Sequence, residues 1–286
     1  MTKTLSYDDV LLVPNYSDIE SRDEVDISNS LDEDIILTLP VIASPMDTVS
    51  EKDMAVAMHK AGGLAMLHRY NSIQEQSAMA FGAARELEYD AIIGAAVGAN
   101  GDYIERVGAL IDSGVLVVCL DVAHGHHSLM ERTIKSLRDK YGDLVHLMAG
   151  NVATLEGFDA LAGWGADSVR VGIGGGSICS TRIQTGHGVP SLTSIIECTK
   201  SKYDASIIAD GGIKNSGDIV KALAAGADFV MVGSLLAGTD EAPGKIVEVP
   251  GVGKCKKYRG MASRDAQLDW RGKSSAPEGI STMIPY

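Results

Sequence analysis

The chain has few large aromatic side chains, no paired cysteines and no long apolar run. Its 286 residues include only three Phe and two Trp, so the core has to be aliphatic, as is typical of buried parallel strands. The four cysteines form no CxxC pair, which argues against a disulfide framework and a paired-cysteine zinc site. No apolar run is long enough to span a bilayer, and the first residues do not resemble a signal peptide. We therefore expect a soluble cytoplasmic protein with no membrane partner.

Positive charge is also scarce. The chain has 25 basic and 38 acidic residues, a formal net charge of −13. A nucleic-acid surface needs clustered Lys and Arg to neutralise phosphates, so no nucleic-acid partner is expected. A single phosphate can still bind, because backbone amides at a helix N-terminus suffice for it.

Short apolar runs recur along the chain at intervals of roughly 20–30 residues, each followed by a helix-like stretch. The eight runs are 39–46, 64–68, 91–98, 115–123, 145–152, 168–174, 206–212 and 229–236. Helix-like stretches include 50–60, which a capping box of Ser50 and Asp53 would open, and 128–140, 155–161 and 216–225. Alternation of this kind predicts parallel strands. Eight units favour an α/β fold of the (β/α)8 TIM barrel class as one domain over 1–286, with an open sheet as the alternative.

The ends of these runs are rich in glycine and polar residues, and barrels build active sites at the carboxyl ends of their strands. The segments are 44–47, 68–69, 121–125, 149–151, 172–176, 210–212 and 233–234. After 241 the alternation stops. We expect a hairpin within 243–257 and an extended, mobile arm over 258–286, so that 242–286 acts as a C-terminal flap on the active site.

Three glycine-rich segments predict two functional features, a phosphate site and a reactive cysteine. Segments 210–218 and 233–238 are typical of a phosphate site, although two tight βα turns would explain them too. Segment 172–182 leads to Cys179, which is flanked by hydroxyls and followed by Arg182. A thiolate at this place is a suitable nucleophile for an electron-poor ring carbon. The alternative is a small buried thiol, the interpretation that we adopt for the other cysteines, Cys119, Cys198 and Cys255.

Five segments, in order along the chain, resemble the IMP dehydrogenase/GMP reductase family. They are Ser-Tyr-Asp-Asp-Val-Leu-Leu from 6, Met-Asp-Thr-Val from 46, 172–182, 210–218, and Tyr-Arg-Gly-Met from 258. The resemblance implies a TIM-barrel oxidoreductase in which Cys179 bonds covalently to purine C2 of a nucleoside monophosphate, helped by Thr181 and Glu278.

The resemblance also implies the other site residues. The substrate-binding set is Ser177, Asp210, Gly212, Gly233, Ser234, Tyr258, Gly260 and Met261. The set for a nicotinamide cofactor is Asp121, Ala123, His124, Gly125, Asn151 and Gly172. A potassium site would use the carbonyls of Gly174, Gly176 and Cys179, in a loop with Gly175 where the family normally has Pro. A homotetramer is implied as well.

Two activities share such a site. The reductase converts GMP or dGMP to IMP or dIMP and ammonia with NADPH, whereas the dehydrogenase converts IMP to XMP with NAD and water. The reductase is favoured by His68-Arg69, by Thr185-Gly186, by the lack of an inserted regulatory domain near residue 70, and by a flap without an Arg-Tyr pair. Segments 210–218, 233–238 and 258–261, and the pair Gly62-Gly63, read closer to the dehydrogenase.

We therefore hypothesise a GMP reductase. The alternatives are an IMP dehydrogenase lacking the regulatory modules and a catalytically inactive nucleotide-binding relative.

Overall fold

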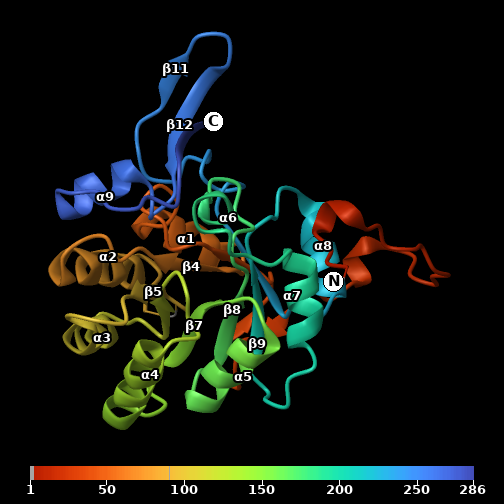
Figure 1. The fold of residues 1–286 in the computed structure, drawn as a ribbon, viewed down its shortest axis with the longest axis horizontal. Coiled ribbons are helices and arrows are strands. Elements are labelled where there is room, and N and C mark those ends of the chain that lie inside the picture. Colours follow the sequence, from red (N-terminus) through yellow and green to blue (C-terminus); the bar gives the residue numbers. More distant parts are fainter. Residues whose placement is uncertain (1–2, 90) are drawn as a thin grey trace.

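A closed barrel of eight parallel strands forms the body of the protein (Figure 1). The computed structural model describes residues 3–89 and 91–286. The barrel strands, in chain order, are β3 (Val41–Ala43), β4 (Leu64–Leu67), β5 (Gly94–Val97), β6 (Val117–Asp121), β7 (His146–Val152), β8 (Ser168–Val171), β9 (Ser206–Asp210) and β10 (Phe229–Val232). Strand β10 pairs with β3 and closes the ring. Each predicted apolar run contains one strand, which confirms the (β/α)8 prediction.

The barrel strands are predominantly apolar because they are covered on both sides. Strands β4, β5, β8 and β10 are buried at every position. The outer cover consists of α1 (Lys52–Lys60), α2 (Ile73–Glu86), α3 (Tyr103–Asp112), α4 (Ser128–Tyr141), α5 (Leu155–Trp164), α7 (Ser191–Cys198) and α8 (Ser216–Ala224), and the short α6 (Thr181–Thr185) follows β8. In the described ranges no helix combines the length and the apolar character needed to cross a membrane.

The predicted capping box at the start of α1 is wrong. The N-cap is Glu51, one residue after the predicted Ser50, and its side chain makes no capping hydrogen bond. Ser50 is fully buried, and its Oγ donates to the carbonyl of Ser44 at 2.7 Å instead. The buried carbonyl of Ser44 needs a hydrogen-bond donor. The Ser50 hydroxyl satisfies it and therefore does not cap the helix. A true capping box stands at the start of α2, where Ser72 and Glu75 bond reciprocally.

An N-terminal hairpin, which the sequence did not predict, plugs the barrel at the end opposite the glycine-rich loops. The chain passes through two short 3-10 turns, η1 (Tyr7–Asp9) and η2 (Arg22–Glu24), before β1 (Asn29–Ser30) and β2 (Ile36–Leu37). Leu31 and Leu37 of this hairpin join a buried cluster with inward-facing residues of the barrel such as Phe229. Short strands of two residues give no periodic signal, which explains the omission.

The segment after β10 forms a small sheet beside the barrel (Figure 1, blue). The predicted hairpin is confirmed as β11 (Val247–Val249) and β12 (Gly253–Arg259). The extended arm is wrong, because α9 (Arg264–Arg271) follows and β13 (Ser281–Pro285) then pairs with β12 over five residues. Ser263 caps α9, accepting the N–H of Ala266 at 3.3 Å. A role of 242–286 as a moving flap stays a prediction.

The hairpin plug is held by a chain of polar groups. The buried ring of His146, at the start of β7, lies 2.7 Å from Asp32 Oδ2 and 2.8 Å from Ser168 Oγ. The hydrogen bond from His146 holds the pKa of the Asp32 carboxyl below its usual value. The ionised carboxylate therefore stabilises the fold above the pKa of an unfolded Asp, about 3.9, and this contribution is lost as the pH falls through the lower folded-state pKa.

We predict that Asp32→Asn lowers the urea midpoint at neutral pH, and that the difference from the parent chain shrinks as the pH falls below about 4. Urea unfolding across a pH series measures it. Asp34→Asn, in the same hairpin but exposed, is the matched control and should leave the midpoint unchanged. A pH-independent loss in Asp32→Asn would contradict an ionic role.

Candidate active site

A cavity of about 610 Å³ lies at the carboxyl ends of the barrel strands, where the sequence predicted an active site. All eight strands supply lining residues from their ends or from the loop that follows, and the C-terminal sheet with α9 closes one side. Lining residues at or just after the ends of β3 to β10, one for each strand, are Ser44, Arg69, Gly98, Asp121, Asn151, Gly172, Asp210 and Gly233.

The fold brings nearly all of the predicted site residues to this cavity. The lining includes Cys179, Thr181, Glu278, Ser177, Asp210, Gly212, Gly233, Ser234, Tyr258, Gly260, Met261, Asp121, Ala123, Asn151, Gly172, Gly174 and Gly176. His124 and Gly125 are not part of it. The His124 side chain is exposed, and the buried Gly125 donates its N–H to the carbonyl of Asn151 at 2.7 Å. The cofactor role predicted for these two residues stays a prediction.

Cys179 lies on the loop between β8 and α6. Its N–H donates to the carbonyl of Gly176 at 3.1 Å, closing a turn, and its Sγ lies 3.1 Å from Thr181 Oγ1. The thiol is half-buried, so a ligand in the cavity can reach it. The turn presents the sulfur and a hydroxyl side by side, the arrangement in which a hydroxyl can take or return the thiol proton.

The other three cysteines are buried, as expected from the sequence. Desolvation by burial raises the pKa of Cys119 to about 11 and that of Cys198 to about 12. Both therefore stay protonated and unreactive at neutral pH. Of the four cysteines, Cys179 is the one that lines the cavity.

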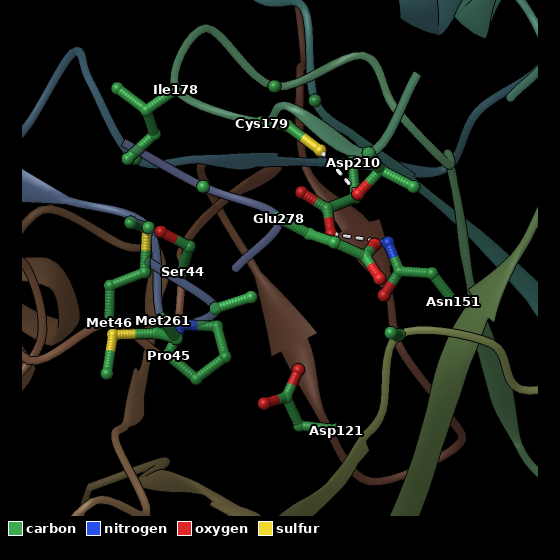
Figure 2. A pocket seen from close by; sticks show the side chains of 18 of the residues that line it. Ser44, Pro45, Met46, Asp121, Asn151, Ile178, Cys179, Asp210, Met261 and Glu278 are labelled. Atoms are coloured by element: carbon green, nitrogen blue, oxygen red, sulfur yellow. Dashed lines mark hydrogen bonds between the residues drawn. The ribbon is translucent and has the colours of Figure 1, made fainter. Parts of the chain in front are cut away.

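Glu278 is held against the cysteine loop by the main chain. Its carbonyl accepts the N–H of Ser180 at 2.9 Å, and its own N–H donates to Ala262 at 3.0 Å. Two residues further on, the N–H of Ile280 donates to the carbonyl of Ile178 at 3.0 Å. Figure 2 shows the labelled side chains of Glu278, Cys179, Asp210 and Asn151 around one space. Two loops distant in sequence thus form one wall of the site.

Arg170 joins the two carboxylates at the base of the cavity, and the sequence analysis missed it. Its Nη1 lies 2.8 Å from Asp121 Oδ1 and its Nη2 lies 2.8 Å from Asp210 Oδ2. Arg69 adds a contact from Nε to Asp121 Oδ2 at 3.3 Å. Burial alone would raise the pKa of Asp121, but the charges of Arg170 and Arg69 outweigh it and lower that pKa. An arginine within the apolar run of β8 was the available signal.

Asn151 positions Asp210 in this structure. Its Nδ2 donates to Asp210 Oδ2 and to the carbonyl of Gly172, both at 2.8 Å. Arg170 also bonds to Oδ2. Because these donors converge on one oxygen, Asp210 Oδ1 is left to accept a ligand hydroxyl, in line with the predicted ribose contact.

Two glycines of the cavity lining allow close contacts that a side chain would block. A Cβ on Gly233 would lie 2.6 Å from Tyr258 Oη and 2.9 Å from Ser44 Oγ. A Cβ on Gly172, which has φ of +148°, would lie 1.9 Å from the carbonyl oxygen of Asp210. Burial raises the pKa of Tyr258 to about 12. Its hydroxyl therefore stays protonated and can donate to a phosphate at neutral pH.

The predicted cation loop has one carbonyl engaged internally, since Gly176 accepts the N–H of Cys179. Gly175 is tightly enclosed, because a Cβ there would lie 2.6 Å from Ser191 Oγ. Within 3–89 and 91–286, no three His, Cys, Asp or Glu side chains are placed to hold a metal ion. A potassium site of backbone carbonyls stays a prediction.

An aromatic pair at the rim was also missed. Trp270 of α9 meets Tyr70, after β4, edge-on with ring centroids 5.9 Å apart. The guanidinium of Arg69 lies over the Tyr70 ring at 4.8 Å. Periodicity cannot predict such a contact, since α9 and the loop after β4 meet only in the tertiary structure.

Comparison with known proteins agrees with the resemblance seen in the motifs. The family model described as "IMP dehydrogenase / GMP reductase domain" matches residues 4–286. An inosine-5'-monophosphate dehydrogenase of Cryptosporidium parvum is 38% identical over 336 residues, covering 99% of this chain and 82% of that protein. One of Nitrosopumilus maritimus is 31% identical over 417 residues, covering 99% and 87%. A GMP reductase of Leishmania major is 31% identical over 424 residues, covering 98% and 86%.

We predict that Arg170→Met destabilises the fold by about 3–5 kcal/mol, because two carboxylates are left buried without their shared cation. Urea unfolding at neutral pH measures this. The loss should shrink at lower pH, since Asp121 then binds a proton in place of its ion pair. Arg170→Lys keeps the charge but cannot bond to both carboxylates in the same geometry, so its stability should lie between those of the parent chain and Arg170→Met. An Arg170→Met chain as stable as the parent would refute the structural role.

Proposed function

We propose that this chain, which belongs to the IMP dehydrogenase / GMP reductase family, is a GMP reductase. The family comprises oxidoreductases that act on purine nucleotides with a nicotinamide cofactor. The reaction proposed within it is the conversion of GMP or dGMP to IMP or dIMP, with release of ammonia and oxidation of NADPH.

The observation that carries the proposal is the short connection between Met261 and Glu278. It consists of α9 and a short return segment, and both of its ends are bonded close to the cysteine loop. A dehydrogenase has to activate water for the second half of its reaction, and loss of a positioned base costs roughly 10²–10⁴ in rate. The connection carries no Arg-Tyr pair for that task.

Arg271 and Tyr70, which both line the cavity, do not replace such a pair. Arg271, at the end of α9, lies close enough to Tyr70 for its charge to act on the phenol. Burial nevertheless raises the pKa of Tyr70, which opposes its use as a base at neutral pH. A deamination has no need of an activated water.

The lack of an inserted regulatory domain is a weaker argument for the reductase than the sequence alone suggested. The alignment to the Leishmania major GMP reductase extends over 424 residues, far more than the 286 of this chain, as does the alignment to the dehydrogenase of Nitrosopumilus maritimus. Relatives of both names thus have residues that this chain lacks, so the choice between the activities depends on the flap.

The cavity fits a purine nucleotide beside a nicotinamide ring. Ser44 Oγ is buried and has no partner among the described residues, and it lies at the glycine-rich end next to Gly233. The Ser44 hydroxyl is therefore a donor that a phosphate could satisfy, and the Tyr258 hydroxyl lies next to Gly233 as well. Asp210 Oδ1 can accept from a ribose hydroxyl. The base then lies toward Cys179, with Asp121 on the opposite wall (Figure 2).

The chemistry follows from the groups around the sulfur. The thiolate of Cys179 bonds to purine C2, the C2–N2 bond breaks, and the amine leaves as ammonia carrying the proton of the thiol. Thr181 passes this proton from sulfur to nitrogen, and Glu278 supplies or removes protons at the purine. A bound nicotinamide cofactor supplies the hydride that ends on C2. The C2–S bond then breaks and Cys179 recovers its electron pair.

We predict that purified protein consumes NADPH with GMP and forms no NADH with IMP and NAD. Absorbance at the reduced-nicotinamide band follows both reactions. Cys179→Ser should abolish turnover and the covalent nucleotide adduct, which mass spectrometry of the intact chain detects. NADH formation with IMP would identify a dehydrogenase instead. Nucleotide binding without either reaction would identify an inactive relative.

Glu278→Gln should lower the turnover rate by roughly 10²–10⁴, because it removes a general acid or base. The fold should persist, since the bonds that hold Glu278 use its main chain. Steady-state kinetics over a pH series, with a thermal melt of the variant, measures both. Glu241→Gln, exposed and outside the cavity lining, is the matched control. Unchanged turnover in Glu278→Gln would remove Glu278 from the mechanism.

The second candidate is an IMP dehydrogenase, which the names of most of the relatives favour. It would use the same covalent bond at Cys179, but a hydride would leave C2 for NAD, and water would then arrive at C2 and release the product from the sulfur. A homotetramer is proposed from the family resemblance, and the mass of the protein in solution tests it.

A further inference from the structure

Lys256 of β12 is a buried lysine that no step of the proposed reaction uses. The residue is 3% exposed, although lysine is rarely buried unless its charge is paired. No salt bridge of the described residues includes it, whereas the adjacent Lys257 pairs with Asp265 at 3.5 Å. Removing an ammonium from water is costly, so other groups have to stabilise it.

Three main-chain carbonyls accept hydrogen bonds from the Lys256 ammonium. Nζ donates to Thr239 at 2.8 Å, to Asp240 at 3.2 Å and to Ala242 at 2.7 Å. An ammonium has three N–H donors, so these carbonyls use all of them and none is left for a ligand. Any effect of Lys256 on a ligand therefore has to pass through the segment that it holds.

That segment, residues 233–242, follows β10 and begins at the end of the cavity where we place the phosphate. Gly233 and Ser234 line the cavity, whereas 239–242 lie outside the lining. The carbonyl of Gly233 accepts two N–H groups from the turn that follows it, at 3.0 and 3.1 Å. Because these bonds make the segment a compact turn, movement at its far end reaches Gly233.

Strand β12 meets this segment at both of its ends. Lys256 and Tyr258 are two residues apart, so their side chains leave the strand on the same face, and both are buried. Tyr258 meets the first end, because a Cβ on Gly233 would lie 2.6 Å from its Oη. Lys256 meets the last end. One strand thus sets the distance between the Tyr258 hydroxyl and the backbone of Gly233.

The segment also packs closely on the neighbouring strand β13. A Cβ on Gly238 would lie 2.2 Å from the carbonyl oxygen of Pro285. The hydroxyl of Tyr286 adds an exposed bond to Asp240 Oδ1 at 2.5 Å. Buried hydrogen bonds from a charged donor are stronger than exposed ones, so the ammonium of Lys256 is the stronger anchor.

We propose that Lys256 is a positioning residue for the phosphate of the purine nucleotide. Its ammonium fixes segment 233–242 on β12, so that the backbone at the start of the segment and the hydroxyl of Tyr258 meet the same phosphate. Without the ammonium, three carbonyls lose their donor and the segment moves away from β12. The inference rests on the proposed function only in so far as that places the phosphate beside Gly233, and it holds for GMP and IMP alike.

The affinity for a nucleotide relative to its nucleoside isolates the contribution of the phosphate. In calorimetry without a nicotinamide cofactor, Lys256→Met should weaken GMP binding about tenfold, the effect of losing one hydrogen bond to a charged group, and leave guanosine binding unchanged. IMP and inosine should behave in the same way. In steady-state assays the KM for GMP should rise with little change in kcat. Lys254→Met removes an exposed charge from the same strand and should alter none of these values.

A general loosening of the fold predicts a different result. If the affinities for GMP and guanosine fall equally, or if their ratio stays as in the parent chain, Lys256 does not position the phosphate. Thermal melts identify a variant that does not fold. Lys256→Gln, which keeps an N–H donor group without the charge, then replaces Lys256→Met, and the same loss of GMP affinity is expected.

Hydrogen exchange on the parent chain tests the same coupling without any variant. GMP should slow amide exchange in 239–242 more than guanosine does. Because these residues lie outside the cavity lining, such protection has to be passed along the segment from the phosphate. Equal exchange with the two ligands would overturn the proposal.

The outcomes separate this role from the proposed activity. A chain that oxidises IMP with NAD, and in which Lys256→Met weakens the nucleotides but not the nucleosides, retains the role and loses the function. A chain that reduces GMP with NADPH, and in which Lys256→Met leaves the ratio of affinities unchanged, retains the function and loses the role.

Discussion

The buried ion pairs of Arg170 are the constraint on which the rest of the active site depends. One guanidinium in β8 holds Asp121 at the end of β6 and Asp210 at the end of β9, so three barrel strands are fixed relative to one another at the base of the cavity. Removing these charges from water is costly, and the cost is offset only while all three remain in place. Asn151 and Arg69 extend the same network to β7 and β4.

Main-chain hydrogen bonds around Glu278 hold the wall of the cavity that carries Cys179, as the ion pairs of Arg170 hold its base. The main chain around Glu278 bonds to the cysteine loop and to the start of the α9 connection, and β13 returns along β12. The reactive thiol, its neighbouring hydroxyl and the carboxylate thus come from segments about a hundred residues apart, yet they share one set of hydrogen bonds. The proposed choice between the two activities rests on the length of this connection.

Sequence prediction failed where a local pattern was overruled by a distant partner. Ser50 looks like a helix cap, but a buried carbonyl of Ser44 takes its hydroxyl. The segment after Tyr258 has weak local signals, and it becomes a helix and a strand because β12 offers an edge for pairing. The plug of β1 and β2 has strands of two residues, which are stabilised by apolar contacts inside the barrel and by the His146 contact.

The sequence by itself determined the eight strands, the end of the barrel that carries the site, and a set of site residues nearly all of which line the cavity. These follow from the apolar period and from glycine and polar residues at strand ends, which are local properties. Only the tertiary structure decided that Arg170 bridges Asp121 and Asp210, that Glu278 is fixed to the cysteine loop, and that Trp270, Arg271 and Arg69 line a second cavity. Those contacts join residues far apart in the chain, and no spacing along the sequence encodes the distance between them.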